Sequence, residues 1–177
     1  MNKLTSLAVA TATALSVSAP AQAATFHDHI PLWNAVHAAT VTIHLNEDYC
    51  DHRPNVAGVY SSQARAMLIC QQNRIPGSTE EVGWTAFDLD TLRHETHHLV
   101  QDCLGNGKGN GLLVAMYEDP YGYARNYFAN LQSNAIVNSY KSKGLNNRLA
   151  LVELEAFAVA ADNNPLEQVE DIVDYCL

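Results

Sequence analysis

The chain has 177 residues, of which 47% are hydrophobic, and it carries 19 acidic against 10 basic residues. This length and composition can supply a hydrophobic core, which excludes disordered and collagen-like proteins. The net charge of −9 and the lack of any run of basic residues argue against a nucleic acid or an anionic membrane surface as partner.

The N-terminal stretch has the layout of a secretory signal peptide. Lys3 precedes an apolar run over residues 7–17, and a small-residue ending places the expected cleavage site after Ala23. The apolar run is far shorter than the roughly 20 residues that cross a bilayer. We therefore expect residues 24–177 to form a single exported domain, secreted or periplasmic, that has no membrane anchor and is a monomer.

The chain contains four cysteines, and an even number in an exported protein predicts two disulfides. No two of them are spaced as CxxC, which argues against a zinc site made of cysteines. Three pairings are possible. We favour Cys50–Cys70, which would join the two ends of a hairpin-like segment, and Cys103–Cys176, which would hold the C-terminal helix.

The chain falls into an extended half and a helical half. The N-terminal segment around His27 and His29 is expected to be a frayed polar end. Alternation and β-branched residues predict short strands at 41–45, 58–60 and 65–70. A helix is predicted to begin at Asp88 or Asp90 and to end at Gly105, where a flexible glycine-rich loop follows up to Gly111. Further helices are expected over residues 112–117, 121–141, 147–162 and 165–175. This order predicts an α+β fold, with a small antiparallel or mixed sheet packed on a mainly helical domain.

The candidate chemistry lies in the first of these helices, at His94-Glu95-Thr-His-His98. Residues four apart share a helix face, so both His94 and His98 can reach one tetrahedral metal ion. Glu95 is rotated to the side where it can bond a water on that metal. This is the HExxH arrangement of zinc peptidases.

Residues at helical spacing form an apolar stripe that lies almost opposite this histidine pair. Its members are Leu89, Leu92, Thr96, Leu99, Val100 and Cys103. We therefore expect the helix to bury one side and to turn the pair toward a cleft, with His97 at the surface or at the cleft rim. The alternative is an amphipathic helix with three solvated histidines.

A catalytic zinc ion needs a third protein ligand. The astacin-like pattern is excluded, because Gln101 and Leu104 stand where it requires glycine and histidine. Two glutamates of a later predicted helix remain, Glu153 and Glu155. We favour Glu153, because it shares its helix face with small apolar residues, where a carboxylate needs compensation. Glu155 remains open, as does an interpretation with both glutamates solvated.

His94-Glu95-x-x-His98 followed by Glu153 resembles the gluzincin metallopeptidases, and the resemblance implies a zincin-like domain. It also implies that His94, His98 and Glu153 hold Zn²⁺ and that Glu95 moves the proton from water to the leaving amine. In several such families an aspartate follows four residues after the glutamate, where this chain has Phe157. An oxyanion donor is also needed, and the candidates are Tyr117, Tyr121, Tyr123, Tyr127 and Tyr140.

The resulting functional prediction is a secreted zinc metallopeptidase that acts on a peptide or protein. One alternative is a non-catalytic secreted binding protein whose zinc or histidine helix is structural. Another is a zinc amidase that acts on cell-wall material.

Overall fold

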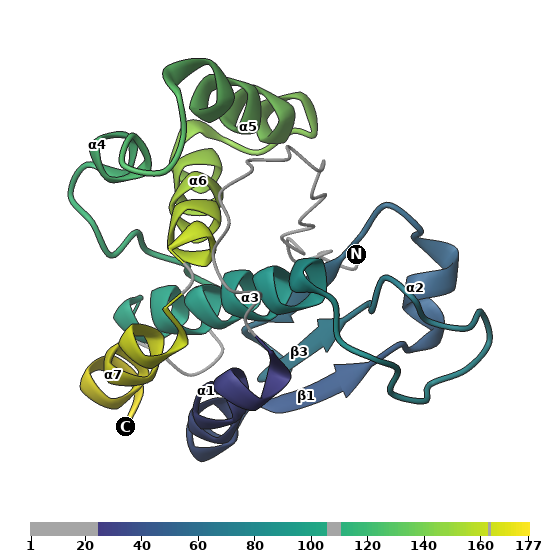
Figure 1. Ribbon diagram of the computed structural model, residues 1–177. Coiled ribbons are helices and arrows are strands. Elements are labelled where there is room, and N and C mark those ends of the chain that lie inside the picture. Colours follow the sequence, from purple (N-terminus) through teal and green to yellow (C-terminus); the bar gives the residue numbers. More distant parts are fainter. Residues whose placement is uncertain (1–24, 106–110, 163) are drawn as a thin grey trace, which may run out of the picture.

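The computed structural model describes residues 25–105, 111–162 and 164–177. The predicted signal peptide and residues 106–110 of the predicted glycine-rich loop lie outside the described residues. Within those ranges the chain forms seven helices and three strands, which confirms the predicted α+β class. Helix α3, Ala86–Leu104, runs through the middle of the structure. Figure 1 shows the sheet, α1 and α7 on one side of it and α4, α5 and α6 on the other.

The sheet is mixed, as expected, and has the order β1-β3-β2. Strand β1, Thr42–Leu45, runs parallel to β3, Ala66–Ile69, and β2, Gly58–Ser61, runs antiparallel to β3. Alternate residues face the core beneath α3, as the period of a strand requires: Ile43, Leu45, Tyr60, Met67 and Ile69. The edge position of β2 next to α3 matters for the site, because Gly58 lies beside the histidine motif.

Helix α3 begins earlier than predicted. Thr85 is its N-cap and forms a capping box with Asp88: the Thr85 hydroxyl accepts from the Asp88 backbone at 3.2 Å, and the Asp88 carboxylate accepts from the Thr85 backbone at 2.8 Å. Burial is not limited to the side of the apolar stripe, and the alternative of solvated histidines is wrong, because every residue from Thr91 to Asp102 is buried. Helices α6 and α7 and strand β2 all pack on α3, so each of its faces meets protein.

Two predicted helices are also wrong. Residues 112–117 are not helical, because this segment gives its backbone N–H groups to α3 and α6 instead of to itself. The predicted helix 121–141 is two helices, α4 (Pro120–Ala124) and α5 (Asn130–Ser142), with a new N-terminus where the Gln132 side chain accepts from the Ala129 backbone at 3.0 Å. Helices α6, Asn147–Ala161, and α7, Pro165–Cys176, follow the expectation closely.

The N-terminal segment is helical rather than frayed. Helix α1, Phe26–Ala38, starts at a capping box in which Asp28 accepts from the Thr25 backbone at 2.8 Å. His29 is fully buried and lies 2.6 Å from an Arg93 nitrogen of α3. Capping and this buried contact order a stretch whose polar sequence predicted disorder.

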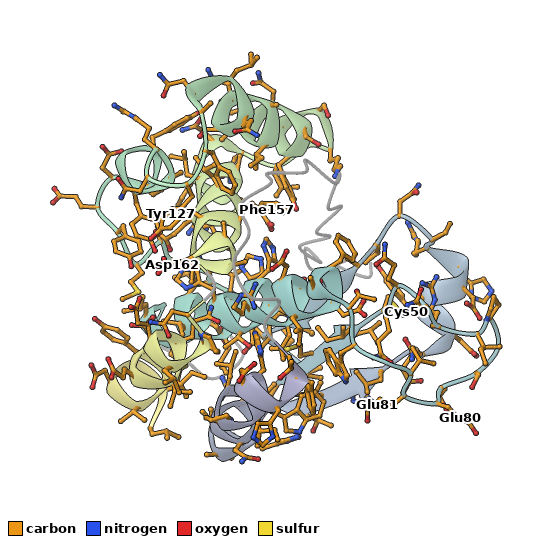
Figure 2. The ribbon with its side chains drawn as sticks, in the orientation of Figure 1. Cys50, Glu80, Glu81, Tyr127, Phe157 and Asp162 are labelled. Atoms are coloured by element: carbon orange, nitrogen blue, oxygen red, sulfur yellow. A yellow bond between two sulfur atoms is a disulfide. The ribbon has the colours of Figure 1, made fainter. Side chains whose placement is uncertain are left out.

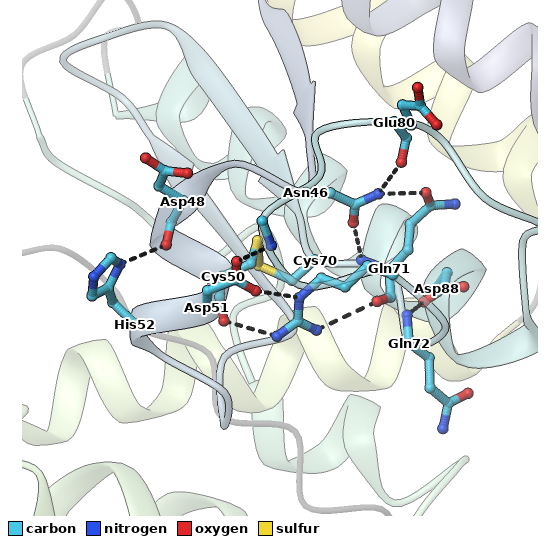
Figure 3. The surroundings of a disulfide bond; sticks show 12 residues. Asn46, Asp48, Cys50, Asp51, His52, Cys70, Gln71, Gln72, Glu80 and Asp88 are labelled. Carbon is cyan, nitrogen blue, oxygen red and sulfur yellow. Dashed lines mark hydrogen bonds and ion pairs between the residues drawn. A yellow bond between two sulfur atoms is a disulfide. The ribbon is translucent and has the colours of Figure 1, made fainter.

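The structure contains both favoured disulfides. Cys50–Cys70 joins helix α2, Asp48–His52, to the end of β3, and Cys103–Cys176 joins α3 to α7. Figure 3 shows the first of them beside a buried amide pair, in which Asn46 donates to Gln71 at 2.9 Å and accepts from its backbone at 2.9 Å. Two disulfides indicate an oxidising, extracellular environment.

In the described part of the chain, every helix is too short or too polar to span a membrane.

Candidate metal centre

Three buried side chains from two helices bring their ligand atoms together. His94 and His98 come from α3 and Glu153 comes from α6, and each is at most 4% exposed. The two Nε2 atoms lie 3.1 Å apart, and Glu153 Oε2 lies 3.5 Å from each of them. A tetrahedral ion at about 2.0–2.1 Å from its ligands separates them by about 3.3–3.4 Å. The triangle of atoms therefore has the dimensions that a single metal ion requires.

The charges of this group also suit a cation. Burial opposes ionisation of Glu153, but the two facing imidazoles hold its pKa well below the ordinary value. Burial lowers the pKa of His94 to about 4. Burial opposes the charge on His98 too, yet the carboxylates of Glu153 and Glu95 raise its pKa to about 9. In the metal-free protein a proton on His98 thus balances the carboxylate, and a metal ion would compete with that proton.

Glu95 lies next to this group and is 1% exposed. Burial raises its pKa to about 8, whereas His98 and the backbone of Tyr60 favour its ionised form. Neither oxygen of its carboxylate has a side chain as hydrogen-bond partner among the described residues. Gly58 of β2 closes the space beside it, since a Cβ atom there would lie 2.9 Å from Glu95 Oε1. Glu95 is thus a buried carboxyl group beside the histidine pair, with a pKa above the ordinary value.

The second candidate glutamate, Glu155, lies away from the ligand triangle and is bound by four donors. It accepts from His97 Nε2 at 2.8 Å, from Gln101 Nε2 at 2.9 Å, and from the backbone of Met116 and Tyr117 at 2.8 and 2.9 Å. The expectation that His97 lies at a surface or cleft rim is wrong, because it is fully buried against Glu155. Burial opposes the charge on Glu155, but these hydrogen bonds leave its pKa below the ordinary value.

Sequence reasoning missed Gln101. Its Oε1 lies 2.7 Å from His98 Nδ1, and its Nε2 donates to Val152 O at 3.0 Å. A polar side chain three residues after His98 on the same helix was the local signal for this contact. The partner Glu155 lies 54 residues further along the chain and has no such local signal.

The two histidines have different surroundings. The ring of His94 packs on Phe157, with centroids 4.5 Å apart, and its Nδ1 has no hydrogen-bond partner in the ranges that the structure describes. Tyr140 is the candidate tyrosine that packs on Phe157, at 6.2 Å. Tyr117 stacks on Tyr123, and Tyr127 contacts Tyr123 with a tilted ring at 5.3 Å. Figure 2 places Tyr127 on the opposite side of α6 from Phe157.

The donor set could hold a metal ion. Two imidazole nitrogens and a carboxylate oxygen, buried and convergent, are ligand types that divalent transition metals accept. Among the described residues this group offers three ligand side chains, His94, His98 and Glu153. In comparisons with known proteins, no family profile, no curated protein and no solved structure matches the chain.

Proposed function

We propose that this protein is an exported zinc-dependent peptidase whose site is formed by His94, His98, Glu153 and Glu95. One observation carries the proposal: a ligand triangle of 3.1, 3.5 and 3.5 Å lies beside a buried carboxylate that accepts no hydrogen bond from a side chain of the described residues. Histidine nitrogen and glutamate oxygen are common zinc ligands, and three of them leave one position for a substrate. A zinc ion held there would polarise the scissile carbonyl and make water a better nucleophile.

The metal ligands and Glu95 would have different roles in this reaction. His94 and His98 must be neutral to present their Nε2 lone pairs, and Glu153 must be ionised. Glu95 would accept a proton from the attacking water and deliver it to the leaving amine nitrogen. Its buried surroundings support that role, because burial makes the carboxylate a stronger base.

The alternative of a non-catalytic protein with a structural metal fits the site less well. A structural zinc site is normally closed by four protein ligands. The described residues offer three, and Glu95 is not among them, which leaves it for the proposed role of base. The number of ligands therefore favours a site in which one coordination position of the metal is left for water or substrate. A zinc amidase would use the same residues, so a peptide library is the substrate that tests the choice.

Glu95→Gln tests the catalytic role, because it keeps the shape of the side chain and removes the base. After loading with zinc, we expect the variant to retain the metal and to hydrolyse a peptide library about 10²–10⁴-fold more slowly than wild type. Glu170→Gln, an exposed substitution on α7, is the matched control and should leave the rate unchanged. Equal rates for wild type and Glu95→Gln would refute the assignment. Zinc-loaded wild type that cleaves no peptide would support the amidase or the binding protein instead.

A further inference from the structure

The orientation of the His98 ring depends on an acceptor at its second nitrogen. An imidazole that offers Nε2 to a metal carries its proton on Nδ1, and that proton needs a hydrogen-bond acceptor in a buried site. His98 is 1% exposed, and its Nδ1 lies 2.7 Å from Gln101 Oε1. The side-chain amide of Gln101 is therefore placed to accept this proton.

An amide has one donor end and one acceptor end, so its own orientation must be fixed as well. The nitrogen end of Gln101 lies 3.0 Å from Val152 O and 2.9 Å from Glu155 Oε1. Val152 O can only accept, and Glu155 Oε1 already faces the Met116 backbone N–H at 2.8 Å and His97 Nε2 at 2.8 Å, so both atoms act as acceptors. The Nε2 end must therefore face α6, and Oε1 must face His98.

Glu155 is in turn fixed in place. It is fully buried, and it also accepts from His97 and from the backbone of Met116 and Tyr117. Helix α6 thus supplies both Glu153 to the ligand triangle and Glu155 to the amide behind His98. His94 has no counterpart of this arrangement among the described residues, and its ring packs on Phe157.

We propose that Gln101, anchored by Glu155, is a positioning residue that fixes the tautomer and the ring orientation of His98 for metal binding. The inference rests on the proposed metal site. It assigns the support of one metal ligand, His98, to Gln101 and Glu155, which lie outside the histidine motif. Partners of this kind typically change metal affinity by about 10–100-fold.

Gln101→Met tests this assignment, because it keeps the length of the side chain and removes both ends of the amide. The matched control is Gln168→Met. Gln168 is also a buried glutamine and donates to a backbone carbonyl of α3, that of Arg93 at 2.8 Å, without contacting the ligand triangle. In competition with a chelator, we expect the dissociation constant for zinc to rise about 10–100-fold in Gln101→Met and to stay unchanged in Gln168→Met.

A second measurement needs no variant and covers the case in which Gln101→Met does not fold. In zinc-loaded wild type labelled with ¹⁵N-histidine, the Nδ1 proton of His98 should resonate downfield of that of His94, because only the former has an acceptor among the described residues. The reverse order, or equal zinc affinity in Gln101→Met and wild type, would overturn this inference alone. If wild type binds no zinc, both this inference and the proposed function are overturned.

Discussion

Gly58→Ala probes the space around Glu95 directly. The added Cβ would lie 2.7 Å from the Thr91 methyl carbon, 2.9 Å from Glu95 Cγ and 2.9 Å from Glu95 Oε1. Ordinary carbon–carbon contacts are about 3.5–4.0 Å, so an atom must move by about 1 Å. Strand β2 is paired to β3 and α3 is enclosed, so the side chains of Thr91 and Glu95 are the parts that must shift.

Two effects should follow from this crowding. Overpacking should lower the free energy of unfolding by about 1–3 kcal/mol. A displacement of about 1 Å at the base should lower kcat/KM by about 10²-fold. Zinc content should stay at the wild-type level, because the three atoms nearest to the added Cβ belong to Thr91 and Glu95 and not to the ligands His94, His98 and Glu153.

The assay compares kcat/KM on a peptide, zinc content and the urea midpoint in Gly58→Ala and in Gly83→Ala. Gly83 is the matched control, since a Cβ atom there meets nothing within 4 Å and its backbone is not left-handed. Gly83→Ala should keep full activity and should change stability by no more than about 1 kcal/mol. A folded Gly58→Ala with the kcat/KM of wild type would refute the role of Glu95 as the base.

Two further predictions concern stability. Replacing both cysteines of Cys103–Cys176 by alanine should lower the free energy of unfolding by about 4.4 kcal/mol, against about 3.3 kcal/mol for Cys50–Cys70, because the sequence separations are 73 and 20. Urea unfolding checks the order, and a larger loss for Cys50–Cys70 would contradict it. Burial lowers the pKa of His29, so its contribution to stability is present above about pH 6.5, the unfolded value, and is lost as the pH falls through the folded one. The urea midpoint of the metal-free protein should therefore fall as the pH is lowered, and it should fall less in His29→Asn than in wild type. Equal falls in the two proteins would exclude His29 as a source of the pH dependence.

The parts of the fold and site that could be predicted from sequence are those with a local signal. The spacing of His94 and His98 places them on one helix face whatever surrounds the helix. The alternation of short apolar segments locates the strands to within a residue or two. The small apolar face around Glu153 distinguishes it from Glu155, and the structure places Glu153 at the pair.

The parts that were missed depend on distant partners. His97 looks like a solvated residue until Glu155, 58 positions away, is brought against it. Residues 112–117 have helix-forming side chains, but the Glu155 carboxylate binds two of their backbone N–H groups and holds them out of a helix. The apolar stripe of α3 predicted one buried face, whereas buried polar pairs allow the other faces to be enclosed too.

The claim that His94, His98 and Glu153 form a metal centre is tested most directly by the zinc content of the purified protein and its affinity. Wild type should retain one equivalent of zinc after desalting. Glu153→Ala should lose most of it, and the exposed control Glu170→Ala should retain it. A chelator should remove the zinc without unfolding the protein, since both disulfides remain. Zinc bound by Glu153→Ala in the same amount and with the same dissociation constant as in wild type would contradict the account.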